Sequence, residues 1–165
     1  MFDIKPAVFE KLASWWRSLE DDRAGRAVLR RAESITAVAL SAPYQRLYRQ
    51  LGRAGWDDNA PDYLKDRLAA VVGLLVHVKD DSQLAPAKAM SARKISDDKS
   101  PVSELRFQRL LESSDIETLF TGLRRVLPLI NHSVDVQALA KDILYWGDNV
   151  KKRWAYDYEW PEKAR

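Results

Sequence analysis

The sequence contains no cysteine and only two histidines, His77 and His132. Without cysteine the chain can form neither disulfides nor thiolate metal sites, which fits a reducing compartment. The two histidines lie in different halves of the chain, and neither belongs to a metal-binding spacing such as HExxH. The sequence also has no glycine-rich phosphate loop and no GxSxG motif. We therefore expect a non-catalytic protein with no metal and no cofactor, in which His77 is a packed side chain.

No apolar run is long enough to cross a membrane. The longest, residues 68–78, is shorter than the about 20 residues that a membrane span needs, and it includes a histidine. It predicts a buried helix. The first residues combine acids with an amphipathic pattern, whereas a signal peptide would have an unbroken apolar run. We expect a cytoplasmic protein without a membrane partner.

What is present favours a helical globular protein. Of the 165 residues, 46% are hydrophobic, 31% are charged and only six are glycine. This length allows one domain or two small ones. The formal net charge of +3 is only mildly basic, so composition alone does not identify a nucleic-acid-binding protein. Whether the protein is suited to bind nucleic acid depends on where its positive charges lie along the chain.

The pattern along the chain predicts an all-α fold of two small helical bundles joined by a linker. The bundles are residues 1–80 and 103–165. Residues 81–102 hold serines, prolines and mixed charges with little periodicity, which is typical of a linker; their basic residues Lys88, Arg93, Lys94 and Lys99 suggest either a mobile basic loop or ordinary surface charge. The predicted helices cover about residues 6–19, 23–42, 43–52 and 60–79, two segments within 104–130 with an end or kink near Leu127, and one long helix over 136–154.

Residues 104–130 are predicted to form two helices, each with an apolar face and with arginines outside that face. Apolar side chains recur at three-and-four spacing, which places them on one side of each helix. Arg106 and Arg109 lie off the apolar face of the first helix. Arg125 falls on the opposite side of the second helix and Arg124 on its flank. Four guanidinium groups are thus left for solvent or for a partner, and the planar arginine fork suits phosphate.

The helix predicted over 23–42 repeats this pattern. Its predicted apolar face consists of Ala24, Val28, Ala32 and Ile35. Arginines occupy roughly the opposite side, with Arg31 nearer the boundary: Arg23, Arg26 and Arg30. The alternative is a solvated helix face with acidic neighbours, because charged faces are common on the helices of globular proteins.

The order of several short motifs along the chain resembles the order found in a known family. Trp15 and Trp16 are followed by GRAVLRRA, PYQRLYRQL with GW, ELRFQRLL, GLRRVLPLI and LAKDILYWGDNVKKRW. Each motif is weak alone, but their order and spacing are similar to those of the small subunit of the type I-E CRISPR Cascade complex, the CasB family. The correspondence spans nearly the whole chain.

The resemblance implies a two-part helical protein that lies as a dimer inside an RNA-guided antiviral complex, next to its backbone and large subunits. It implies backbone contacts, independent of sequence, to the duplex of crRNA and target DNA and to the displaced DNA strand, which together stabilise the R-loop. The candidate nucleic-acid-binding residues that it marks are Arg26, Arg30, Arg31, Arg106, Arg109, Arg124, Arg125, Lys151 and Lys152.

A helical protein–protein scaffold is the alternative function. Its arginine faces would dock acidic surfaces of partner proteins. Exposure of Tyr156, Tyr158 and Trp160 would favour this alternative, since aromatic side chains are enriched at protein interfaces.

Overall fold

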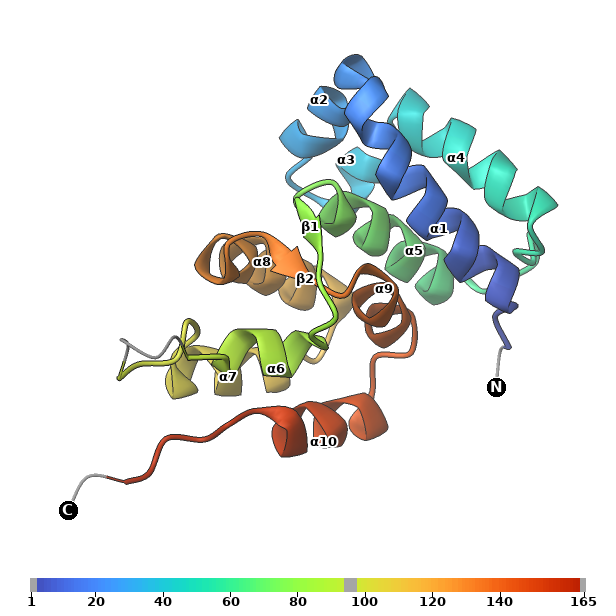
Figure 1. Ribbon diagram of the computed structural model, residues 1–165. Helices are drawn as coiled ribbons and strands as arrows, with labels where there is room; N and C mark the ends of the chain where they lie inside the picture. Colours follow the sequence, from blue (N-terminus) through green and yellow to red (C-terminus); the bar gives the residue numbers. More distant parts are fainter. Residues whose placement is uncertain (1–2, 94–97, 164–165) are drawn as a thin grey trace.

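The computed structural model describes residues 3–93 and 98–163, and within these ranges the chain is mostly helical, as predicted (Figure 1). The α-helices are α1 (Pro6–Ser18), α2 (Arg23–Arg31), α3 (Ile35–Ala39), α4 (Ala42–Arg53), α5 (Asp62–Leu75), α6 (Pro86–Ser91), α7 (Glu104–Leu111), α8 (Ile116–Val126), α9 (Val136–Leu144) and α10 (Asp148–Asp157). Two short 3-10 helices, η1 (Leu19–Asp21) and η2 (Leu127–Ile130), follow α1 and α8. A short parallel pair joins β1 (Asp80–Asp81) to β2 (Ser133–Val134). No helix of the described residues is long and apolar enough to span a membrane.

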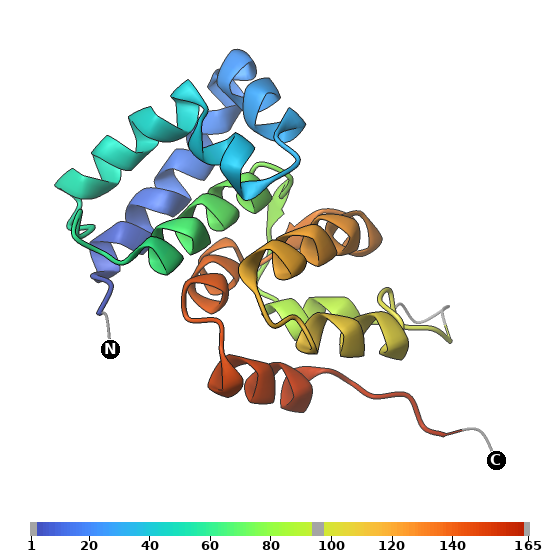
Figure 2. The same cartoon turned by 180° about the vertical axis from the view of Figure 1, so that it is seen from behind.

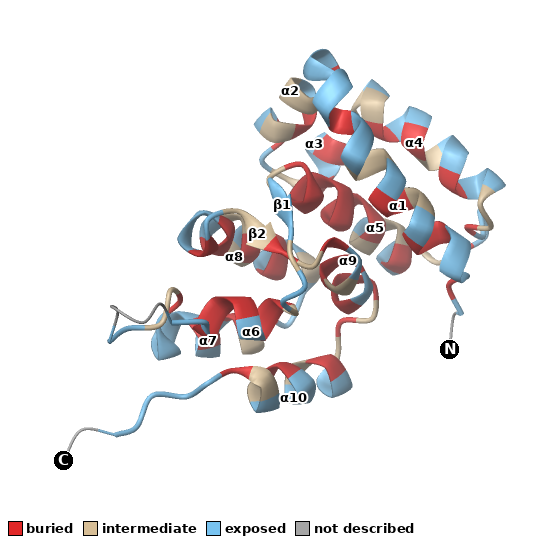
Figure 3. Cartoon of the chain, in the orientation of Figure 1, coloured by how far each residue is buried: buried red, intermediate tan, exposed pale blue. Residues whose placement is uncertain are grey.

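Helix α5 lies at the centre of the molecule. Every residue from 68 to 75 is buried (Figure 3), as its apolar run predicts. It packs against α3 from the first half of the chain and against α8 and α9 from the second half. The buried side chains of both halves consequently form one continuous hydrophobic cluster.

Gly73 is the point where neighbouring helices come closest to α5. A Cβ atom at this position would lie 2.8 Å from Cε1 of Phe120 and 2.8 Å from Cγ2 of Val38. We expect Gly73→Val to lower the free energy of unfolding by about 3 kcal/mol, because overpacking a core costs about 1–3 kcal/mol or more. Urea unfolding measures this change. Gly52→Ala is the matched control, since nothing lies within 4 Å of its added Cβ; equal unfolding midpoints for the two variants would contradict the prediction.

The helix predicted over residues 23–42 is two helices. The side chain of Asp22 accepts a hydrogen bond from Gly25 N at 3.0 Å and begins α2. After α2 ends, Ser34 Oγ accepts one from Ala37 N at 3.0 Å and begins α3. Serine at such a position stabilises a new helix start. The predicted apolar face is therefore partly wrong: Val28 is 38% exposed, whereas Leu29 is fully buried.

The long helix predicted over 136–154 is also interrupted. Helix α9 ends before Tyr145, which leaves helical geometry, and α10 begins at Asp148. Arg67 of α5 donates from Nη1 to the carbonyl of Leu144 at 3.0 Å, so a side chain remote in sequence satisfies the end of α9. Trp146 Nε1 donates to Ser113 O at 3.2 Å and fixes the turn. These tertiary hydrogen bonds replace the helical continuation that periodicity alone suggested.

The segment expected to be a linker contains helix α6. Its Ala87 and Met90 are buried, and the carbonyl of Met90 accepts a hydrogen bond from the N–H of Val102 at 3.0 Å. A six-residue helix is too short to display a helical period in the sequence. The basic side chains Lys88, Arg93 and Lys99 are exposed, and Lys94 lies outside the described residues.

Candidate nucleic-acid interface

Helices α7 and α8 bound a groove of about 660 Å³, here called the α7–α8 groove. The two helices lie in the second half of the molecule, in yellow and orange in Figure 2. Arg106 and Arg109 of α7 line the groove together with Arg125 of α8. The structure thus brings together three of the arginines that the sequence marked.

Local capping and packing orient these arginines. Ser103 Oγ accepts a hydrogen bond from Arg106 N at 3.3 Å and begins α7, and Asp115 does the same for α8 with Thr118 N at 2.7 Å. The buried Phe107 turns the opposite face of α7 outward. A Cβ at Gly122 would lie 2.8 Å from Cδ2 of Leu110, so the two helices approach closely. This close approach lets arginines from both helices share one groove.

The α7–α8 groove has a positive charge that no local acid fully balances. Arg106, Arg109 and Arg125 are exposed, and none of them forms an ion pair within the described part of the chain. Glu117 also lines the groove, so three positive charges and one negative charge give a formal net charge of +2. Exposed guanidinium groups in a concave surface suit phosphate oxygens, to which arginine can donate two parallel hydrogen bonds.

Arg124 has a different role from its neighbour Arg125. It is half-buried and donates from Nη2 to the carbonyl of Arg30 at 3.4 Å, across to the last turn of α2. Its Cζ also lies 5.8 Å from the ring centroid of Phe120. Arg124 therefore links α8 to α2, whereas the sequence pattern left its guanidinium group, like that of Arg125, for solvent or for a partner.

His77 lies within the electrostatic influence of Arg30 and Arg124. The pKa of His77 is lowered from 6.5 to about 4, first by burial and then by the positive charges of Arg124 and Arg30 and by His132. The carbonyl of His77 lies 2.9 Å from Nδ1 of His132, while its own Nε2 is buried without a hydrogen-bond partner among the described residues. His77 is therefore packed as a neutral side chain.

This arrangement predicts a loss of stability in mild acid. In the unfolded chain His77 binds a proton near its ordinary pKa of 6.5, whereas in the folded chain it stays neutral down to about pH 4. The free energy of unfolding contributed by His77 should therefore fall as the pH falls through this window, and change no further below it. Urea unfolding at several pH values should show a flatter pH dependence for His77→Gln than for the wild type. Identical pH profiles would contradict the prediction.

The remaining predicted residues of the first half lie outside the α7–α8 groove. Arg31 is exposed at the end of α2. Arg26 lines a second, smaller groove near the ends of α1 and α5, together with Arg17 and Lys79. The sequence pattern did not single out Arg17, in the last turn of α1, or Lys79, which follows α5, because neither belongs to a run of arginines.

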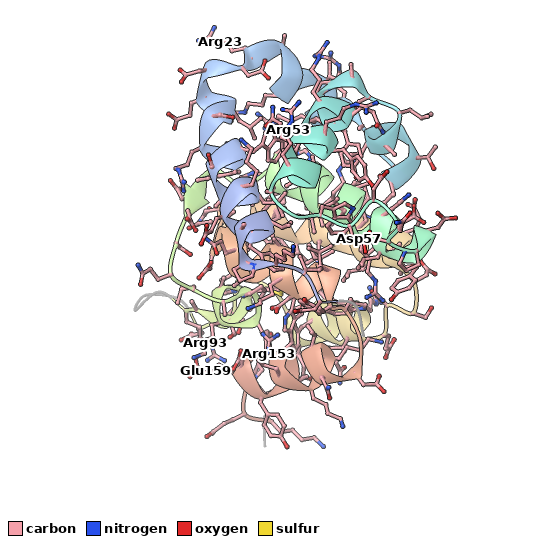
Figure 4. All side chains as sticks on the ribbon, turned by 90° about the vertical axis from the view of Figure 1, so that its right-hand side faces the viewer. Arg23, Arg53, Asp57, Arg93, Arg153 and Glu159 are labelled. Carbon is pink, nitrogen blue, oxygen red and sulfur yellow. The ribbon has the colours of Figure 1, made fainter. Side chains whose placement is uncertain are left out.

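The lysines of α10 line neither groove. Lys151 Nζ lies 5.7 Å from the ring centroid of Trp146, and Lys152 is exposed. Their neighbour Arg153 instead forms a bidentate ion pair with the buried Asp142, at 3.1 and 2.6 Å. Figure 4 shows Arg153 at the opposite end of the molecule from Arg23 of α2. The candidate nucleic-acid-binding residues are therefore spread over the molecule. Of these candidates, Arg106, Arg109 and Arg125 line one groove together.

The C-terminal aromatic residues differ in exposure. Tyr158 is buried, stacks on Phe107 with ring centroids 4.0 Å apart, and donates its hydroxyl to Val102 O at 2.6 Å. Trp160 is 38% exposed, and Tyr156 is 90% exposed. The exposure expected of a scaffold protein is thus present at Tyr156 and Trp160 and absent at Tyr158.

No group of three or more metal-ligating side chains that could hold an ion occurs in residues 3–93 and 98–163.

Comparison with known proteins identifies the family. No curated protein and no solved structure matches the chain significantly. The model of the family described as CRISPR-associated protein Cse2 matches residues 25–158, which is most of the chain. The chain therefore belongs to the Cse2 (CasB) family, whose members are structural small subunits of the type I-E CRISPR Cascade complex.

Proposed function

We propose that this Cascade subunit stabilises the R-loop by contacting nucleic-acid backbones through the α7–α8 groove. The observation that supports this function most is the meeting of Arg106, Arg109 and Arg125, from two helices, in one groove with net positive charge. The proposed ligands are the duplex of crRNA and target DNA and the displaced DNA strand. Arg26, Arg30, Arg31, Arg124, Lys151 and Lys152 remain further candidate contacts.

The energetics of R-loop formation suit such contacts. Exchanging a DNA duplex for an RNA–DNA duplex is nearly balanced in free energy, so a few contacts to the backbone can shift the equilibrium. Contacts to phosphate position the protein without reading the bases. The subunit would therefore support any guide sequence equally, and the guide RNA alone would choose the target.

The two-part organisation and the assembly belong to the same proposal. Within the described residues, α1 and α2 both pack on α4, while α6 packs on α10 and α7 on α8. These contacts support two helical units, residues 1–80 and 103–165, joined by residues 81–102, whose helix α6 packs on the second unit. Helices α1 and α5 of the first unit both pack on α9 and hold the two units together. We place a dimer of the subunit beside the backbone and large subunits of the complex.

The salt dependence of binding tests the proposed function. Fluorescence anisotropy of the purified protein with single-stranded DNA, duplex DNA and a preformed R-loop should give affinities that fall with increasing salt. The slope of log K against log salt is about −0.9 per phosphate contact on a duplex and about −0.7 per contact on a single strand. Unrelated sequences should give the same slope. Absence of binding to all three ligands at low salt would contradict the proposal and favour the docking of acidic protein surfaces, for which the exposed Tyr156 is the supporting feature.

A further inference from the structure

A second groove, here called the Trp16 groove, lies where the ends of α1 and α5 meet η1 and α2. Its volume is about 260 Å³, and it is lined by Trp16, Arg17, Glu20, Arg26 and Lys79 together with apolar side chains. Pockets that enclose whole small molecules measure about 300–1,000 Å³. The Trp16 groove is therefore suited to one flat ring of a larger ligand.

The indole of Trp16 is held in a fixed position. Its Nε1 donates a hydrogen bond to the carbonyl of Val78 at 2.9 Å, across 62 positions of the sequence. The ring is half-buried, and its remaining surface contributes to the groove. Because the polar edge of the indole is already satisfied, what it offers a ligand is its aromatic surface.

Positive charge surrounds this aromatic surface. Arg17, Arg26 and Lys79 line the groove, and none of them forms an ion pair within residues 3–93 and 98–163. Glu20 is the acid among the lining residues, so the formal net charge of the groove is +2. The backbone of Lys79 is fixed by its N–H, which donates to His132 O at 2.7 Å.

Helix α2, which carries Arg26 of the Trp16 groove, is linked to α8 by the side chain of Arg124. Arg26 and Arg30 are four residues apart on α2 and so lie on the same side of that helix. The carbonyl of Arg30 accepts the hydrogen bond from Arg124, whose neighbour Arg125 lines the α7–α8 groove. The helix that carries Arg26 is thus hydrogen-bonded to one of the two helices that line the α7–α8 groove.

We propose that the Trp16 groove binds single-stranded DNA, with one unstacked base on the indole of Trp16 and the flanking phosphates on Arg17, Arg26 and Lys79. An aromatic surface beside cations is the combination that binds single strands without sequence preference, because every base has a face that can stack. The bases of a duplex are stacked on each other and cannot enter. This inference rests on the proposed function and adds to it a site that selects single strands over duplexes.

The test compares two single-stranded DNA ligands that differ only in their bases. One is an ordinary mixed sequence, and the other is an oligonucleotide of the same length made of abasic sites. Stacking of one base contributes about 1–3 kcal/mol, so the full-length protein should bind the ordinary strand about 5- to 150-fold more tightly in fluorescence anisotropy. Trp16→Leu should bring this ratio close to one and leave the affinity for the abasic strand unchanged. Trp16→Phe should keep most of the ratio, because it keeps a ring.

Further variants separate this inference from a general loss of structure. Trp160→Leu, at a tryptophan that does not line the groove, should leave the ratio unchanged. Arg17→Gln combined with Lys79→Gln should weaken the binding of both ligands, because the phosphates are common to them. A wild-type ratio of one, or an unchanged ratio in Trp16→Leu, would overturn the inference. If salt-dependent binding of both ligands persisted in that case, the proposed function of the α7–α8 groove would stand.

Discussion

Replacing Arg106, Arg109 and Arg125 together with glutamine should lower the affinity of the protein for a duplex of RNA and DNA by roughly 100-fold at 0.1 M salt. Each phosphate contact releases counterions, and each lost contact should make the slope of log K against log salt less negative by about 0.9. The three side chains are exposed on α7 and α8, so glutamine at these positions should leave the fold intact. Anisotropy titrations over a range of salt concentrations measure both quantities.

Two controls make this result specific to the α7–α8 groove. Glu117→Gln removes the acid from the same groove and should raise the affinity. Arg49→Gln removes an exposed arginine of α4, outside the groove, and should leave the salt slope unchanged. If the triple variant kept the wild-type slope, the three arginines would not be phosphate contacts, and the function proposed for this groove would be wrong.

Asp142→Ala should lower the free energy of unfolding by about 3 kcal/mol. Asp142 is only 3% exposed, and its carboxylate accepts hydrogen bonds from both Nη atoms of Arg153 and, at 2.8 Å, from Nε1 of the buried Trp154. Alanine removes these charge-assisted bonds and leaves the indole N–H buried without a partner, which costs about 1–3 kcal/mol by itself. Urea unfolding followed by circular dichroism measures the loss.

The comparison for Asp142 is an exposed acid of the neighbouring helix. Asp148 lies in the first turn of α10, where its charge interacts with the helix dipole, and Asp148→Ala should cost only about 0.5 kcal/mol. Asp142→Asn keeps one acceptor for Trp154 and should fall between the two alanine variants. A loss from Asp142→Ala no larger than that from Asp148→Ala would show that the buried carboxylate is not an important link between α9 and α10.

The sequence correctly predicted features that depend on the residue spacing within a single helix. The apolar run of α5 predicted its burial, and the spacing of α7 and α8 predicted that Arg106, Arg109 and Arg125 would be exposed. Reasoning from periodicity failed where the chain leaves a helix. Ser34 begins a new helix after α2, and the hydrogen bond from Arg67 to Leu144 ends α9. The second of these depends on a partner 77 positions away.

The sequence by itself determined the helical class, the buried centre and the Cse2 family, because these depend on local spacing and on the order of motifs along the chain. The tertiary structure alone decided which cations meet. It separated Arg124, which binds the carbonyl of Arg30, from Arg125 in the α7–α8 groove. It also brought Lys79 to Arg17 and Trp16. Side chains on different helices become neighbours only when the apolar faces of those helices pack, and a one-dimensional pattern does not contain that packing.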